Sequence, residues 1–238
     1  MKRDRLFATI AVILIVPAFA QAGVVETASE RFTLVAAEGG FNTDGPTRVD
    51  AASAFGLFDN ISFANASMGG NGGSSNASQN STIDPGNYVV DLDVRADAFG
   101  DGSDFASGYA ESSFEVSFTL TSSEDFNIAG FGGAFGQING ETSKTEIVIE
   151  SLGGGSPTQV IVSETDDFPS FDISGTLLPG DYKLTASSLA IVDRIFDNGF
   201  GDASASARFT MTITPEPSSI ALLVIGGLAA RRQRRQQL

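Results

Sequence analysis

The sequence predicts an all-β protein, an antiparallel, jelly-roll-like β-sandwich, from three observations. Apolar and polar residues alternate with period two in several windows, which is typical of strands with one buried and one wet face. Turns rich in Gly and Pro separate these windows. No window outside the two termini has the apolar stripe of an amphipathic helix.

Eight windows fit strands, and their boundaries follow the turn residues between them. We expect strands at residues 32–37, 58–64, 88–96, 114–120, 145–152, 159–163, 182–186 and 209–214. In the third window Val90 and Leu92 share one face, whereas Asp91 and Asp93 fall on the other. The segment 153–157 is rich in turn residues and predicts a hairpin between the strands beside it.

Phe is expected to supply most of the core, because the chain has 19 Phe, 3 Tyr and no Trp. A body of this size, residues 23–214, buries about 70% of its unfolded surface, so one core needs no disulfide. The segment 65–82 is rich in Asn, Ser, Ala and Gly, and we expect a long surface loop there. A short pattern occurs twice, at Pro85–Tyr88 and at Pro179–Tyr182. It indicates either a duplicated half-sandwich or a common strand entrance.

Composition and charge exclude several classes of function. The chain has no Cys and no His, so it has neither a thiolate nor an imidazole for catalysis and no Cys/His zinc site. Residues 23–214 contain 27 acidic and 7 basic residues, and this net charge of −20 repels nucleic acids and anionic lipids. There is no G-x-S-x-G motif, and Lys144 and Lys183 lie in strand patterns that place them in solvent. We therefore expect a protein that is not an enzyme and that does not bind nucleic acid.

Residues 1–22 have the three parts of a secretory signal peptide. A basic start that includes Lys2 is followed by the apolar stretch 6–16. Small residues for cleavage then occur at two alternative sites, Ala18-Phe19-Ala20 and Ala20-Gln21-Ala22. The apolar stretch is shorter than a membrane span, which favours a cleaved signal helix over an uncleaved anchor. We expect signal peptidase and the export machinery as partners, and a mature body outside the cytoplasm.

The C-terminal residues 215–238 contain three elements in order. Pro215, Glu216 and Pro217 come first, and the apolar segment 220–230 follows. As a short transmembrane helix this segment would reach about 16 Å, roughly half of the hydrocarbon core of a bilayer. The last element is an arginine cluster that keeps the tail in the cytoplasm, formed by Arg231, Arg232, Arg234 and Arg235.

This tail resembles the PEP-CTERM sorting signal of exported proteins of Gram-negative bacteria. The resemblance lies in the tripeptide Pro215–Pro217, the apolar segment and the arginine cluster at the extreme C-terminus. It implies that the chain is a substrate of exosortase, an integral-membrane enzyme that reads and removes the tail. The protein would then pass from the inner membrane to the cell surface or extracellular matrix, often beside exopolysaccharide. The resemblance covers only the tail, and an ordinary membrane anchor of the same topology is the alternative.

Two acidic loops of the body are candidates for a calcium site. Calcium prefers about six to eight oxygen ligands, which Asp-rich turns provide. The candidate ligands are Asp101 and Asp104 in one loop and Asp197 and Asp202 in the other, although neither loop has the spacing of an EF-hand. Solvated acidic turns are the alternative interpretation, since Asp and Gly dominate turns.

Direct carbohydrate binding has less support, because sugar platforms favour Trp and Tyr and because most Phe residues are expected to face inward. We expect an exported, non-enzymatic surface or matrix protein with a structural or adhesive role in the biofilm matrix. Its expected partners are exosortase and exopolysaccharide, and calcium is the one cofactor considered. The alternative is a calcium-dependent carbohydrate-binding module.

Overall fold

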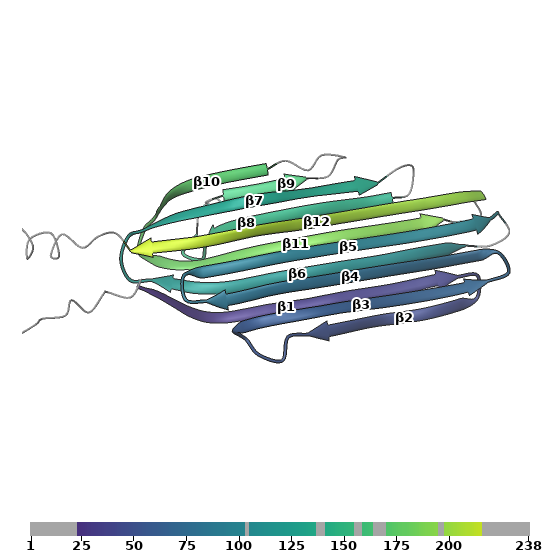
Figure 1. The fold of residues 1–238 in the computed structure, drawn as a ribbon, viewed down its shortest axis with the longest axis horizontal. Helices are drawn as coiled ribbons and strands as arrows, with labels where there is room; N and C mark the ends of the chain where they lie inside the picture. Colours follow the sequence, from purple (N-terminus) through teal and green to yellow (C-terminus); the bar gives the residue numbers. More distant parts are fainter. Residues whose placement is uncertain are drawn as a thin grey trace, which may run out of the picture. The chain divides into compact units, whose positions relative to one another are not determined.

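Antiparallel strands in two facing sheets make up the described part of the chain in a computed structural model (Figure 1). The structure describes residues 23–102, 105–136, 141–154, 159–163, 170–194 and 198–215. These ranges contain twelve strands and no helix. The expected all-β, antiparallel, two-sheet architecture is therefore confirmed.

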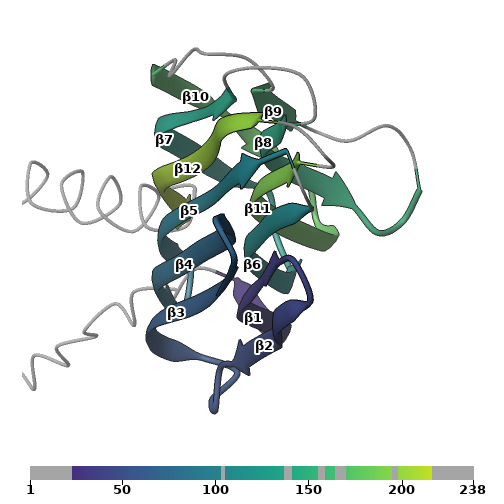
Figure 2. The ribbon, with the colours of Figure 1, turned by 90° about the vertical axis from the view of Figure 1, so that its right-hand side faces the viewer.

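The two sheets have six strands each and form two layers (Figure 2). Sheet A has the order β2 (Asn42–Asp50), β1 (Val24–Gly39), β6 (Ala106–Leu120), β11 (Gly180–Arg194), β8 (Glu141–Ser151) and β9 (Gln159–Ser163). Sheet B has the order β10 (Ser170–Leu177), β7 (Glu124–Gly136), β12 (Asn198–Pro215), β5 (Asn87–Asp101), β4 (Asn71–Asp84) and β3 (Gly56–Met68).

The chain crosses repeatedly between the sheets. β5 and β6 lie in different sheets, as do β11 and β12, and these four strands form the central pair of each sheet. β1 begins and β12 ends at the same end of the sandwich, since Val24 is opposite Leu120 and Pro215 is opposite Glu124 (Figure 1). We call this end the terminal end. The opposite end, which contains the β1–β2 and β3–β4 turns, is called the tip.

Large apolar side chains fill the sandwich at the terminal end. Tyr88 of sheet B and Tyr182 of sheet A both lie against Phe118, with ring centroids 5.8 and 5.7 Å from its own. Both copies of the repeated Pro-Gly pattern therefore place an aromatic ring in one core, from opposite sheets. The expected inward faces of residues 88–96, 114–120 and 209–213 are confirmed as buried.

Small side chains replace the large ones toward the tip. The buried cluster there contains only Ala and Val. The sheets approach so closely that a methyl group on Gly73 would lie 1.8 Å from the backbone oxygen of Ser107. A methyl group on Gly108 would lie 2.6 Å from the backbone oxygen of Ser74. The core is thus built from Phe, Tyr, Leu and Ile at one end only, and near the tip the two backbones meet.

A row of buried hydroxyl groups crosses the inner face of sheet A between these two clusters. The row consists of register neighbours from four strands, Thr33, Ser112, Ser188 and Thr145. Ser112 donates a hydrogen bond to the carbonyl of Ser78 at 3.1 Å, and Thr145 donates one to the carbonyl of Gly133 at 2.9 Å. Both carbonyls belong to sheet B, so the row joins the two sheets by hydrogen bonds and satisfies polar groups that burial would otherwise penalise.

The expected surface loop at residues 65–82 is wrong. This segment forms the end of β3, a turn and most of β4, and Ala77 and Gln79 face the interior. Small residues fit in this part of the sandwich, because the two sheets approach closely there. Small residues are also common in loops, and the composition of this segment therefore predicts a loop. The sequence also does not predict β2, β7 and β10. Most of the predicted strands are longer in the structure than the windows in the sequence, and β12 has 18 residues.

The predicted hairpin around residues 153–157 is confirmed, because β8 and β9 are antiparallel neighbours. The expected signal peptide 1–22, the apolar segment 220–230 and the arginine cluster lie outside the described residues. Within the described residues, no helix has the length and apolar character needed to cross a membrane.

Candidate functional site

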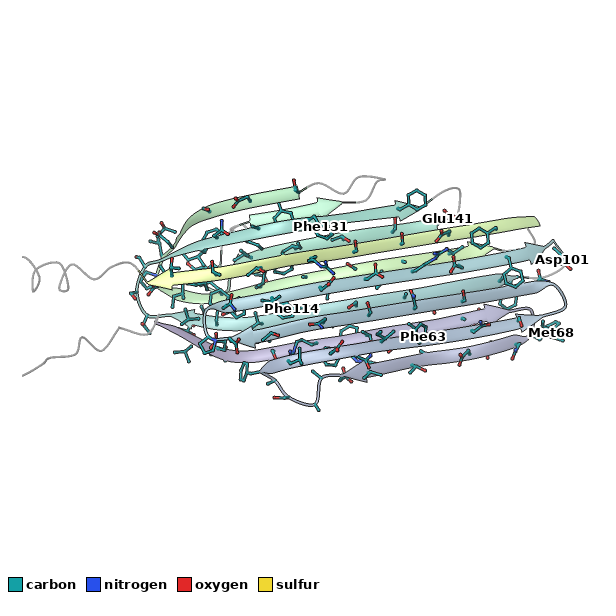
Figure 3. All side chains as sticks on the ribbon, viewed as in Figure 1. Phe63, Met68, Asp101, Phe114, Phe131 and Glu141 are labelled. Carbon is teal, nitrogen blue, oxygen red and sulfur yellow. The ribbon has the colours of Figure 1, made fainter. Side chains whose placement is uncertain are left out.

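A groove lies on the outer face of sheet B and has a volume of about 420 Å³. Its lining residues come from β3, β4, β5, β12 and β7, so it crosses five adjacent strands. Figure 3 labels Phe131 on β7 and Phe63 on β3, the strands at the two sides of the groove. The groove is therefore a property of the paired sheet and not of one loop.

Strand register places the groove residues in two parallel rows. The first row consists of direct cross-strand neighbours, Asp59, Asn80, Asp91, Arg208 and Phe131. The second row, two residues along each strand, consists of Ile61, Ser78, Asp93 and Ser206. All of these residues point outward because their neighbours in sequence occupy the buried positions. Four strand intervals of about 4.8 Å make the first row about 19 Å long.

The centre of the first row is an ion pair between Asp91 and Arg208. The Nε of Arg208 donates to Oδ2 of Asp91 at 2.8 Å, and one terminal nitrogen of the guanidinium contacts the same oxygen. The hydrogen bond to Asp91 raises the pKa of Arg208. The guanidinium also lies 5.8 Å from the ring centroid of Phe131. Arg208 is therefore held in place across the groove floor from both sides.

Asp93 has a different electrostatic environment from Asp91. Desolvation raises the pKa of its carboxyl group, and the nearby charge of Asp91 adds to this effect, whereas Arg208 and Arg95 oppose it. Arg95 is engaged in the next row along, where it pairs with Asp97 at 3.0 Å and Asp202 at 3.2 Å. Neither arginine lies within ion-pair distance of Asp93.

Several polar side chains in the groove have no partner among the described residues. Asn80 provides an amide, Ser78 and Ser206 provide hydroxyl groups, and Asp59 and Asp93 provide carboxylates. None of these five side chains makes a hydrogen bond or an ion pair to another described residue. They are available to donate to, or accept from, a bound molecule.

The groove also has apolar walls. Phe131 is 40% exposed at one side and Ile61 is 59% exposed toward the other, with Phe63 beyond it on the same strand. The expectation that most Phe residues face inward is therefore too simple. Several are exposed, Phe41, Phe55, Phe63, Phe99, Phe131 and Phe200.

The outer face of sheet A has paired charges instead. Lys183 lies 3.0 Å from Glu150 and 3.7 Å from Glu115, and Lys144 lies 2.9 Å from Glu146. The predicted outward position of both lysines is confirmed. Both lysines are engaged in ion pairs with glutamates, whereas Asp193 on the same face has no basic partner among the described residues.

The structure does not bring together the two described members of the predicted calcium site. Asp101 and Asn71 hydrogen-bond to each other through both side chains and a backbone amide, at 3.1 Å. Asp202 is opposite Asp97, four positions from Asp101 along β5, or about 13 Å. Across the described ranges, no group of three or more Asp or Glu side chains is placed to hold a metal ion.

Asp104 and Asp197 lie outside the described residues, as do Glu216, Pro217 and the four arginines of the tail. Pro215 is the last residue of β12 and is opposite Glu124. The calcium and sorting hypotheses therefore stay predictions.

The sequence does not predict the groove, although it predicts the outward position of some of the groove residues. The alternation of Asp91 and Asp93 with Val90 and Leu92 placed two groove residues outward correctly. The composition of residues 65–82 predicts a loop at Asn80, and the sequence predicts no strand around Phe131. The pairing of β4 with β5 and of β12 with β7 is long-range, and it is this pairing that assembles the rows.

Comparison with known proteins identifies no family: no protein-family model matches the chain, and no curated protein matches it. Among solved structures, the chain is weakly similar to the enzymatically active domain of tailspike protein 4 of bacteriophage CBA120. That match has 11% sequence identity and a TM-score of 0.26, and it covers 65% of this chain and 19% of the other. At this TM-score the likeness supports no inference about either fold or function.

Proposed function

We propose that this protein is an exported, non-enzymatic component of the surface or extracellular matrix of a Gram-negative bacterium, delivered by a PEP-CTERM signal. In that location the groove of sheet B binds an extended polysaccharide chain and gives the protein an adhesive role. The observation that carries the binding proposal is the groove, which combines unpartnered polar side chains with exposed apolar walls.

Polysaccharides match this combination of groups. Sugar hydroxyls both donate and accept hydrogen bonds, and Asn80, Ser78 and Ser206 offer complementary groups along the floor. The C–H faces of sugar rings are apolar and pack on exposed side chains such as Phe131 and Ile61. A row of about 19 Å accommodates several rings in line rather than one.

The position of the groove suits a protein that is processed at its C-terminus. Arg208 precedes Pro215 by seven positions of one strand, or about 23 Å, so the groove lies along the face of the sandwich and not at its terminal end. The proposed sorting signal begins at Pro215, the last residue of β12. Removal of the tail after this residue therefore leaves all of the groove residues in the mature protein.

The strand order supports a finer description of the fold. We propose that β5–β12 form a jelly roll of two four-stranded sheets, β5-β12-β7-β10 and β6-β11-β8-β9. In this description β3 and β4 extend one sheet, and β1 and β2 extend the other.

A binding experiment tests the groove proposal. Purified full-length protein is applied to an array of bacterial and plant polysaccharides, with calcium and with chelator, and affinities for bound polymers are measured by calorimetry. We expect binding that resists chelation and that is lost in Phe131→Ala/Arg208→Gln. Binding that the double variant retains in full would place the site elsewhere, and binding abolished by chelator would favour the calcium-dependent alternative.

Mass spectrometry of the mature, cell-associated protein tests the sorting proposal. We expect the C-terminal residues to be absent after processing, and an intact Gln236–Leu238 would contradict removal of the tail. Neutral substitution of Arg231, Arg232, Arg234 and Arg235 should impair retention at the membrane before processing. Unchanged fractionation of that variant would count against the proposed role of the cluster.

A further inference from the structure

The charge in the groove of sheet B is not balanced. Asp91 and Arg208 neutralise each other, but Asp59 and Asp93 make no ion pair and no hydrogen bond to any described residue. Asp59 stands on β3 and Asp93 on β5, on either side of β4. The groove therefore presents two unneutralised carboxylates around the polar side chains of β4.

A bound metal ion is a poor fit to these carboxylates. A cation such as calcium needs several oxygen ligands converging on one point. Asp59 and Asp93 are two strands and two residues apart, about 12 Å along the diagonal of the sheet. In the described part of the chain, no three acidic side chains lie around one point where they could hold a metal ion.

Building on the proposed polysaccharide function, we propose that the groove selects polymers of amino sugars whose amino groups are free rather than acetylated. An ammonium group on one sugar ring pairs with Asp93, and one on a ring further along the chain pairs with Asp59. The spacing of the two carboxylates suits charges repeated along a polymer. The net charge of −20 on the body attracts such a polycation toward the groove.

The other groove residues contact the hydroxyl groups and the apolar faces of the sugar rings. Asn80 and Ser78 lie between the two carboxylates and hydrogen-bond to ring hydroxyls. Ile61 and Phe131 pack on the ring faces. An acetylated nitrogen is neutral, and it leaves both carboxylates without a counter-charge after water is displaced.

Matched oligosaccharides test the proposal directly. Calorimetry compares chitosan hexamer, with free amino groups, and chitin hexamer, with acetylated ones, for binding to the full chain at 150 mM salt. We expect the chitosan hexamer to bind at least about tenfold more tightly, equivalent to about 1.4 kcal/mol. In Asp59→Asn/Asp93→Asn this preference should disappear, because the chitosan hexamer loses its two counter-charges. The chitin hexamer, which no longer covers two uncompensated carboxylates, should bind this variant at least as tightly as it binds the parent chain.

A charge-matched variant separates the groove from general attraction between opposite charges. Asp84→Asn/Asp193→Asn removes the same two charges from exposed positions outside the groove and should keep the preference. An equal loss of chitosan binding in both double variants would overturn the proposal. If the parent chain binds the chitin hexamer as tightly as the chitosan hexamer or more tightly, the proposed preference is also overturned, but the polysaccharide-binding function is not. If neither hexamer binds and no polysaccharide of the array binds, both the preference for amino sugars and the polysaccharide-binding function are contradicted.

Discussion

The outer faces of the two sheets are made by the same alternation of strands, but their charges are arranged differently. On sheet A, Lys183 lies between Glu115 and Glu150 and forms an ion pair with each of them. On sheet B, the groove keeps Asp93 without an ion pair although Arg208 and Arg95 are nearby, because each arginine is engaged by another Asp.

The difference is the reason why we propose sheet B as the binding face of this acidic β-sandwich. Acidic residues are common on both faces, so their number says little. What distinguishes sheet B is that polar side chains with no partner in the described part of the chain lie between exposed apolar side chains. If all of the charged residues of this face were paired with each other, we would interpret it as an ordinary solvated surface.

The largest effect is expected when the apolar walls are removed. In Phe131→Ala/Ile61→Ala we expect affinity for the bound polysaccharide to fall by about 100-fold, because each wall contributes roughly 1–1.5 kcal/mol of ring packing. The melting temperature should change little, since both side chains are exposed. Tyr109→Ala/Ile191→Ala is the matched control on sheet A, where the two residues are cross-strand neighbours. A comparable loss of binding in the control would break the contrast between the faces.

A smaller effect is expected from Arg208→Gln, which removes the ion pair with Asp91. Affinity should fall by about tenfold, because the guanidinium no longer anchors the groove floor or packs against Phe131. Stability should fall by at most about 1 kcal/mol, since the pair is exposed. Calorimetry and denaturant unfolding measure the two quantities, and a large loss of stability with normal affinity would assign the pair a structural role only.

Asp93→Asn should raise stability at neutral pH. The raised pKa of Asp93 means that its charged form is disfavoured in the folded state. This cost is present above the folded pKa and disappears as the pH falls through that value toward the ordinary Asp pKa of 3.8. Thermal unfolding from pH 7 to pH 3 should show the gain at neutral pH and its disappearance in acid. Asp84→Asn, at an exposed position on β4, serves as the control.

The smallest effect is expected on sheet A. Lys183→Gln removes two exposed ion pairs, which together stabilise the fold by no more than about 1 kcal/mol. Polysaccharide affinity should stay within the error of the parent. A clear loss of binding would mean that the face of sheet A also contributes to the site.

The sequence predicted the fold class well because the alternation is strong where large apolar residues are used. Tyr88, Val90 and Leu92 are fully buried, and Val90 and Leu92 alternate with the acidic residues Asp91 and Asp93. β4 is not predicted from the sequence because Ala, Ser, Gly and Gln occupy most of its buried positions, so the contrast in polarity between its two faces is weak. Small residues are required there by the approach of the sheets at Gly73, which only the paired structure reveals.

The groove could be predicted only in part for a related reason. The outward positions of Asp91 and Asp93 follow from local alternation. The alignment of Asp91 with both Asn80 and Arg208 depends on the pairing of β5 with β4 and β12, and Arg208 is 117 residues away along the chain. Local patterns do not determine such register.

The most direct test of the account is a nuclear magnetic resonance titration of the isotopically labelled full chain with a bound oligosaccharide. We predict that the shifted amide signals belong to the outward rows of β3, β4, β5, β12 and β7, centred on Asp91 and Arg208. Signals from β6, β11 and β8 should not move beyond the effect of salt. Shifts centred on sheet A or on the tip, or none at saturating ligand, would contradict the assignment of the groove as the binding site.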